Sequence, residues 1–186
     1  MNARIIAGKY GGRTIKTPQK ITTHPMAERV RGSLFNIINN ELEGAMVLDA
    51  FAGSGALGLE ALSRGAKQAL FIEKDRIAQK VITENIAALG VESQAKAIKA
   101  RVGAWDSTAP EESQFDIIFA DPPYHDVQFS TVEKLFKRLK PNGLMVLSHP
   151  DRECVPSING VVVVDNRSYG DAVLTLYRQE KREKSA

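Results

Sequence analysis

Four consecutive residues, Asp121, Pro122, Pro123 and Tyr124, directly follow an apolar run at residues 115–120. Two adjacent prolines cannot continue a strand or a helix, because each has a fixed φ and no N–H to donate. Ligands of parallel sheets bind at the carboxyl ends of such apolar strands. The cluster therefore predicts a carboxylate and an aromatic ring held rigidly at a ligand site. A tight surface turn is the alternative that these four residues leave open on their own.

A glycine-rich loop lies between another apolar run, at residues 45–50, and a helical pattern. Gly53, Gly55 and Gly58 fit G-x-G-x-x-G, a spacing that lets the backbone approach a nucleotide cofactor and the helix pack on the strand. The next apolar run ends in Glu73, near the offset of about 20 residues at which an acid binds ribose hydroxyls. NAD and S-adenosylmethionine (SAM) are both compatible with these residues, and a glycine turn without a ligand is the alternative.

Two details favour SAM over NAD. Asp49 stands just before the glycine loop, where a phosphate would be repelled but a sulfonium or ammonium cation would be tolerated. A dehydrogenase also needs a proton donor beside the hydride acceptor, and no obvious donor follows the run that ends at Asp121. The sequence therefore predicts a methyl donor as the cofactor.

The bulk composition is that of a folded chain with one substantial core, since 43% of its 186 residues are hydrophobic and 25% are charged. Its single cysteine, Cys154, excludes an intramolecular disulfide and offers no zinc-ligand spacing, which favours a reducing compartment. No apolar run approaches the roughly 20 residues that span a bilayer, and the N-terminus lacks a secretory pattern. We expect a cytoplasmic protein that uses neither a membrane nor a metal.

Basic residues are concentrated near the N-terminus. Residues 1–40 carry seven Lys or Arg against one acid, a charge of +6, whereas the remainder carries −3. A basic segment on a slightly acidic body indicates a polyanionic partner. We therefore expect two units, a basic N-terminal hairpin and helix at residues 1–40 that binds RNA, and a catalytic domain at residues 41–186.

The hydrophobic pattern predicts an α/β fold with a mostly parallel sheet. Five short apolar runs alternate with helical patterns, and two further runs near the C-terminus are predicted to form an antiparallel pair at the sheet edge. The predicted strands are residues 45–50, 68–75, 94–100, 115–121, 143–150, 161–166 and 171–179, and the main predicted helices are residues 56–65, 76–90 and 127–140. At the N-terminus we expect a hairpin with a two-residue turn at Gly11 and Gly12, followed by a helix at residues 26–38.

The sequence resembles a known family at several points. Asp49-Ala-Phe-Ala-Gly-Ser-Gly followed by Asp121-Pro-Pro-Tyr124 is similar to class I SAM-dependent methyltransferases that modify exocyclic amines. The stretches RIIAGKYGGR, ERVRGSLFNI, LDAFAGSGALGLEALSRGA and SYGDAVLTLY resemble the RsmD family of bacterial 16S ribosomal RNA guanine-N2 methyltransferases. The resemblance covers nearly the whole chain. It implies a seven-stranded Rossmann-like class I methyltransferase sheet and methylation of a guanine N2 amine in 16S rRNA of the small ribosomal subunit.

This resemblance implies a role for each candidate site residue. An exocyclic amine is a poor nucleophile until hydrogen bonds hold it, and the Asp121 carboxylate and Pro122 carbonyl would accept its two N–H groups. The prolines would keep these acceptors rigid, and Tyr124 would stack on a base displaced from its helix. The implied catalytic residues are Asp121, Pro122, Pro123 and Tyr124. The implied cofactor-binding residues are Asp49, Phe51, Ala52, Gly53, Ser54, Gly55, Glu73, Lys74, Arg101, Val102 and Asp121.

The predicted partner is ribosomal RNA or the small-subunit particle, and we expect a monomer. The predicted RNA-binding residues are Arg4, Lys9, Arg13, Lys16, Arg29 and Arg31. The segment from His24 to Gly32 departs from the family pattern Arg-Pro-Thr-Thr-Asp-Arg-Val-Arg-Glu but retains both arginines. Three alternatives remain: an adenine-N6 methyltransferase acting on DNA or RNA, an RNA-binding protein with an inactive methyltransferase fold, and an NAD-dependent dehydrogenase.

Overall fold

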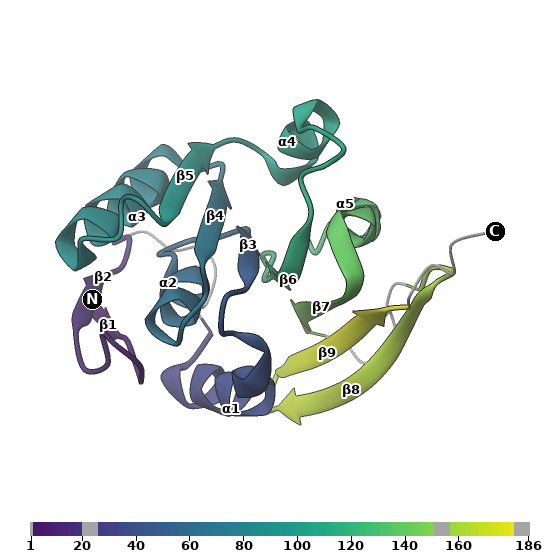
Figure 1. The fold of residues 1–186 in the computed structure, drawn as a ribbon, viewed down its shortest axis with the longest axis horizontal. Coiled ribbons are helices and arrows are strands. Elements are labelled where there is room, and N and C mark those ends of the chain that lie inside the picture. The colour runs from purple at the N-terminus through teal and green to yellow at the C-terminus, as the bar shows by residue number, and fades with distance from the viewer. Residues whose placement is uncertain (1, 20–25, 151–156, 181–186) are drawn as a thin grey trace.

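A seven-stranded sheet forms the body of the protein in the computed structural model, which describes residues 2–19, 26–150 and 157–180 (Figure 1). The strands lie in the order β5-β4-β3-β6-β7-β9-β8. The first five strands in this order are parallel, and β9 is antiparallel to both β7 and β8. Their bounds are β3 Met46–Ala50, β4 Gln68–Glu73, β5 Ala95–Lys99, β6 Phe115–Ala120, β7 Leu139–His149, β8 Val161–Tyr169 and β9 Ala172–Gln179. The predicted fold class and the antiparallel edge pair are confirmed.

Helices cover both faces of this sheet, because consecutive residues of the central strands are apolar and point to opposite faces. Val47 packs with one hydrophobic cluster and its neighbour Leu48 with the other. The first cluster contains side chains from α1 Glu28–Ile38, α2 Ala56–Ser63 and α3 Arg76–Leu89. The second contains side chains from α4 Val102–Thr108, α5 Phe129–Leu135 and the 3-10 turn η2 Phe136–Arg138. A second 3-10 turn, η1 Asn39–Glu41, follows α1.

The strand order creates a point where ligands bind in such sheets. Strand β3 pairs with β4 on one side and with β6 on the other, and all three run parallel. The chain proceeds from β3 outward to β5 and then returns to β6 on the opposite side of β3. The carboxyl ends of β3 and β6 therefore flank a topological switch point. The glycine loop and the Asp121 cluster both begin there.

The predicted two-residue turn at Gly11 and Gly12 is wrong. The hairpin strands are only β1 Asn2–Arg4 and β2 Thr14–Lys16, and Arg4 pairs with Thr14. Several backbone amides of the connecting residues 5–13 instead donate to α2. The amides of Ile6 and Ala7 donate to Glu60, and the amide of Lys9 donates to the Ser63 carbonyl oxygen. These amides are consequently not available to extend the hairpin ladder.

Gly8 shows how closely the connection approaches α2. Its φ is +86°, and a Cβ atom at this position would lie 2.0 Å from the Ser63 carbonyl oxygen. Residues 2–19 and α1 therefore lie against the body of the protein (Figure 1). We call residues 2–19 the arm.

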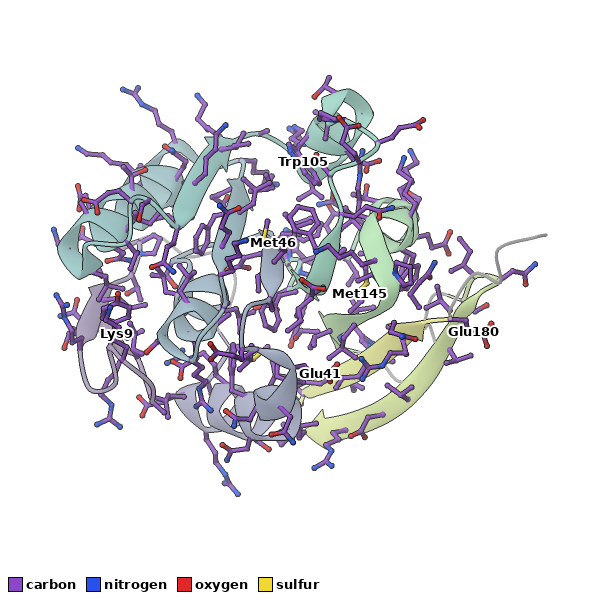
Figure 2. All side chains as sticks on the ribbon, in the orientation of Figure 1. Lys9, Glu41, Met46, Trp105, Met145 and Glu180 are labelled. Carbon is purple, nitrogen blue, oxygen red and sulfur yellow. The ribbon has the colours of Figure 1, made fainter. Side chains whose placement is uncertain are left out.

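Three local expectations also differ from the structure. The predicted strand at residues 143–150 begins earlier in the structure, because β7 starts at Leu139, and its pairing with β6 shifts register between Phe115 and Ile117. The predicted helix at residues 127–140 ends as α5 at Leu135. The pattern did not predict α4, whose seven residues are too few for clear periodicity. Within α4, Trp105 is buried, as expected for a core aromatic (Figure 2).

His24, Pro25 and Cys154 lie outside the described residues. Within the described ranges, no helix has both the length and the apolar character needed to cross a bilayer.

Candidate active site

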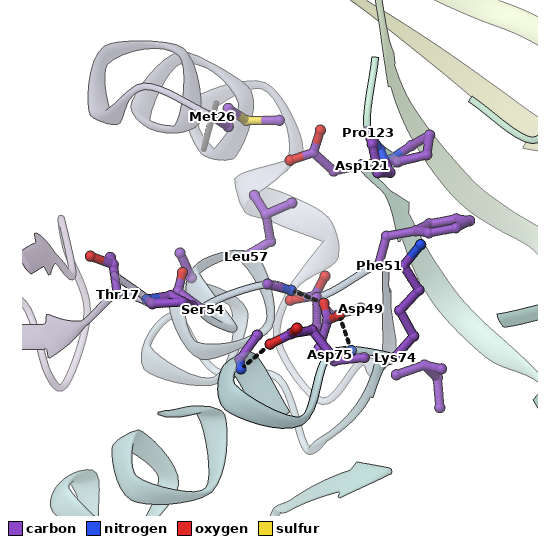
Figure 3. Close-up of a pocket in the computed structure, with 18 of the residues that line it drawn as sticks. Thr17, Met26, Asp49, Phe51, Ser54, Leu57, Lys74, Asp75, Asp121 and Pro123 are labelled. Atoms are coloured by element: carbon purple, nitrogen blue, oxygen red, sulfur yellow. Dashed lines mark hydrogen bonds between the residues drawn. The ribbon is translucent and has the colours of Figure 1, made fainter. Parts of the chain in front are cut away.

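A cavity of about 930 Å³ opens at the carboxyl ends of β3, β4 and β6 (Figure 3). The structure brings together the predicted catalytic residues and the predicted cofactor-binding residues, since all of them except Gly55 line this cavity. The lining predicted residues are Asp49, Phe51, Ala52, Gly53, Ser54, Glu73, Lys74, Arg101, Val102, Asp121, Pro122, Pro123 and Tyr124. Gly55 lies next to the wall, where its φ of +81° begins α2.

The loop after β3 is tightly constrained. Phe51 has a φ of +57°, a conformation that non-glycine residues seldom adopt and that is found most often at functional sites. The third glycine of the motif, Gly58, has a packing role, because a Cβ there would lie 2.3 Å from the Phe71 ring. Close contact between α2 and β4 therefore requires a glycine at this position.

Asp49 is a buried acid whose hydrogen bonding is incomplete. Its Oδ2 accepts the Gly58 amide at 2.9 Å, whereas Oδ1 has no partner in the described part of the chain. Burial raises the pKa of Asp49 well above its usual value, and the negative charges of Asp121 and Glu73 raise it further. A cationic ligand in the cavity would stabilise the ionised form of this carboxylate.

Glu73 is fixed in position by two backbone donors. Its Oε2 accepts the Gly53 amide and its Oε1 accepts the Asp75 amide, both at 2.8 Å. Each carboxylate oxygen keeps a second lone pair, so Glu73 can also accept hydroxyl donors from a ligand. Asp75 in turn caps α3 by accepting the Ala78 amide at 2.8 Å. The glycine loop and the end of β4 therefore form one rigid wall.

Asp121 lies in the same cavity, at the carboxyl end of β6. Burial raises its pKa to about 6, and a hydrogen bond from Ser148 opposes part of this rise. The Ser148 hydroxyl also lies 2.7 Å from the Tyr124 hydroxyl. Burial raises the pKa of Tyr124 as well. Near neutral pH, Asp121 is therefore a poorly solvated carboxylate able to accept a hydrogen bond.

Ser148 was missed at the sequence level. It is only 2% exposed and lies near the end of β7, which pairs in parallel with β6. The sequence signal that could have identified Ser148 is its hydroxyl group near the end of a predicted strand, the same kind of position that Asp121 occupies. The predicted strand at residues 143–150 included it without a role.

The arm and α1 form another wall of the cavity, which the sequence did not predict. Residues from β1, the end of β2 and the start of α1 line it, so the cavity extends from the glycine loop to the basic N-terminal region. These residues are Asn2, Ala3, Thr17, Pro18, Gln19, Met26, Ala27, Glu28 and Arg31. In Figure 3, Thr17 and Met26 are drawn around the same cavity as Ser54 and Asp121.

Five of the six predicted RNA-binding residues are exposed, and several already have partners. Arg4 pairs with Glu28 at 2.5 Å and Lys16 with Glu84 at 3.1 Å. Arg13 donates to the Ala88 carbonyl oxygen at 2.6 Å, and the Lys9 ammonium lies 5.5 Å from the Tyr10 ring centroid. Exposed ion pairs are weak, so phosphates can compete for these cations.

Arg31 differs from the other predicted RNA-binding residues. It is only 3% exposed, and burial lowers its pKa. One of its terminal nitrogens donates to the Arg4 carbonyl oxygen, while its Nε has no hydrogen-bond partner among the described residues. Arg31 therefore lies in the cavity wall and not on an exposed basic face, because it is on the same buried side of α1 as Leu34, Phe35 and Ile38.

The sheet order, the glycine loop at the switch point and the Asp-Pro-Pro-Tyr cluster together define a class I methyltransferase. The chain belongs to the family described as Conserved hypothetical protein 95, whose model matches residues 3–178.

Relatives of known name agree with this assignment. Ribosomal RNA small subunit methyltransferase D of Escherichia coli (strain K12) is 39% identical over 143 residues, which cover 75% of this chain and 68% of that protein. The Bacillus subtilis (strain 168) protein YlbH is 32% identical over 182 residues, covering 95% and 98%. The solved structure of Escherichia coli yhhF superposes with a TM-score of 0.87 at 30% identity, covering 98% of this chain and 100% of that chain. The predicted RsmD resemblance is confirmed.

Proposed function

We propose that this methyltransferase transfers a methyl group from SAM to the exocyclic N2 amine of a guanine in 16S rRNA of the small ribosomal subunit. The observation that carries the proposal is the position of Asp121. Its carboxylate lines the same cavity as Asp49, Glu73 and the glycine loop. An amine held by Asp121 would therefore lie in one enclosed space with a cofactor bound at the loop.

The acidic wall of the cavity fits a cationic nucleoside. SAM supplies a methyl group on a positively charged sulfur, together with an ammonium group and ribose hydroxyls. Asp49 Oδ1, which has no hydrogen-bond partner among the described residues, suits a cationic group, and the fixed oxygens of Glu73 suit the hydroxyls. Lys74, Arg101 and Val102 line the same cavity and would lie beside the adenine. Phosphate groups of a dinucleotide would instead meet a buried carboxylate at Asp49.

Asp121 and Pro122 would hold the target amine by accepting its N–H groups. The prolines keep both acceptors in place before the base arrives, so little reorganisation is needed. Tyr124, whose hydroxyl bonds to Ser148, would present its ring to a base displaced from the RNA. A carboxylate with a pKa of about 6 is ionised near neutral pH and is still able to take up a proton as the amine loses one.

The arm suits an RNA partner. Its cations Arg4, Lys9, Arg13 and Lys16 are exposed, and they lie on the same segment whose residues Thr17 to Gln19 line the cavity. Phosphate contacts from Lys and Arg dominate RNA affinity. The relatives from Escherichia coli and Haemophilus influenzae are named ribosomal RNA small subunit methyltransferase D. We extend that substrate to this chain, with residues 1–40 as the RNA-binding extension, residues 41–186 as the catalytic domain, a monomeric state and a cytoplasmic location.

The direct test is transfer of radiolabelled methyl from SAM to small-subunit rRNA and particles that lack the modification, followed by nucleoside analysis. Label in N2-methylguanosine is the expected result. Label in N6-methyladenosine would overturn the guanine assignment while keeping the chemistry. SAM binding without label in either substrate would favour the alternative of an RNA-binding protein with an inactive fold.

A variant separates binding from chemistry in the same assay. Asp121→Ala should still bind SAM, about tenfold more weakly at pH 7, and lose turnover by about 10²- to 10⁴-fold, the range for a positioned proton acceptor. Unchanged turnover would remove Asp121 from the reaction.

A further inference from the structure

Asn85, on α3, joins two segments that are far apart in the sequence. Its Oδ1 accepts the Lys16 amide at 2.9 Å, and its Nδ2 donates to the Lys16 carbonyl oxygen at 3.0 Å and to the Ser54 carbonyl oxygen at 3.1 Å. The residue is only 2% exposed. One buried amide therefore connects the end of the arm strand β2 to the glycine loop. Neither the motif nor the expected site residues include Asn85.

The arm end of this connection leads directly into the cavity. Lys16 is the last residue of β2, and Thr17, Pro18 and Gln19 after it line the cavity wall. Strand β2 lies beside α3, with the Lys16 ammonium also 3.1 Å from Glu84 (Figure 1). A phosphate that draws Lys16 away from Glu84 would act on the residue whose backbone Asn85 holds.

The loop end of the connection sets the orientation of one peptide group. The Ser54 carbonyl is held by Asn85, and the amide of the next residue, Gly55, donates to the Ala52 carbonyl oxygen at 2.8 Å. This peptide immediately precedes α2, and Ser54 itself lines the cavity. Rotation of the peptide would displace both the loop and the first turn of the helix.

We propose that Asn85 is a positioning residue that couples the arm to the glycine loop, so that RNA on the arm and nucleoside cofactor at the loop strengthen each other's binding. The inference rests on the proposed function. Its physical basis is that a hydrogen bond between two segments is most effective when both are ordered, so ordering either one lowers the cost of ordering the other. By linkage, the effect must be equal in both directions.

Binding measurements with the non-reacting product S-adenosylhomocysteine test the coupling at equilibrium. In the wild-type protein, saturating unmodified small-subunit rRNA should lower the Kd of this ligand by about fivefold or more, the lower end of typical coupling. In Asn85→Ala and Asn85→Asp, which lose the donor to Ser54, the factor should fall to about one. Wild-type binding of both ligands with no coupling, or coupling retained in both variants, would overturn the inference and leave the proposed function intact.

Ser63→Ala is the matched control. Ser63 is also buried and also holds the arm, by donating to the Ala7 carbonyl oxygen and accepting the Tyr10 amide, but it lies at the far end of α2 from the glycine loop. Loosening the arm there should weaken RNA binding while keeping the coupling factor. Equal loss of coupling in Ser63→Ala would assign the effect to arm stability in general and overturn the specific role of Asn85.

Hydrogen exchange on the wild-type protein gives a test that does not depend on variant folding. Adding the rRNA without cofactor should slow exchange of the Ala52, Gly53 and Gly55 amides, each of which is bonded within the loop or to β4. Unchanged exchange at these amides while the arm amides are protected would overturn the inference. Failure of the wild-type protein to bind either ligand would instead refute the proposed function itself.

Discussion

Replacing Asp121 by Asn should stabilise the protein at alkaline pH while impairing its activity. Burial raises the pKa of Asp121 from 3.8 to about 6. The folded state therefore binds this proton more tightly than the unfolded state does. The resulting stability is fully present below the unfolded pKa and is lost as the pH rises through about 6. At pH 8 the wild-type protein carries the whole cost of a buried charge, which the neutral amide of Asn avoids.

The size of the effect follows from the pKa shift. One pKa unit corresponds to about 1.4 kcal/mol, so the shift sets an upper figure of about 3 kcal/mol. Because Asp121 borders an open cavity, we expect about 1 to 3 kcal/mol. For a chain of this size, 1 kcal/mol moves Tm by about 2 to 4 °C, which predicts a rise of roughly 2 to 12 °C.

Thermal unfolding of both proteins near pH 4 and pH 8 measures this directly. The Asn variant should have the higher Tm near pH 8, and the difference should nearly vanish near pH 4. Asp126→Asn is the control, since Asp126 is exposed on the same loop and should give no pH-dependent difference. An Asp121→Asn variant that is less stable than wild type at both pH values would refute the argument that burial controls this carboxylate.

Three further predictions concern proton affinity and RNA contacts. Ser148→Ala removes the hydrogen bond that opposes the rise in the Asp121 pKa, so the acid limb of the kcat/KM profile should move above pH 6. Tyr124→Phe leaves Ser148 intact and should move this limb less. SAM should bind about tenfold more tightly at pH 7 than at pH 5, because its positive charge favours the ionised form of Asp121. Calorimetry that finds the same pH dependence of SAM affinity in Asp121→Asn would contradict this prediction. Changing Lys9 or Arg29 to Gln should reduce the salt dependence of RNA binding by about one phosphate contact each. Lys134→Gln, on α5 at the other face of the sheet, should leave the slope unchanged.

Much of the site could be predicted because its residues stand at strand ends. Asp49, Glu73 and Asp121 each lie at or just after the end of an apolar run, and parallel strands bring such ends to one edge of the sheet. The sheet order itself placed these three acids around one cavity. Short-range periodicity and strand-end chemistry were therefore sufficient for this part.

The residues that escaped prediction act through long-range contacts. Glu60 is a fully buried acid within the apolar helix ALGLEALS and therefore requires partners. Arg64, one turn later, is a local partner, but the other two are arm amides 53 and 54 residues away. Asn85 bonds to Lys16 across 69 residues, and Ser148 to Tyr124 across 24. A polar residue on a buried face signals that a partner exists, but its identity depends on tertiary structure.

The attachment of the arm to α2 and α3 also determines when it can fold during synthesis. The arm is synthesised before α2 and α3, and Asn85, which holds its last strand residue, follows 69 residues later. At about 5 to 20 residues per second, the arm waits roughly 3 to 14 seconds for that partner. During this interval its cations are free to contact the ribosome that is making them, and the short hairpin lacks most of the surface it packs against. The basic segment is therefore a late-folding part of the chain, although it is made before the helices that hold it.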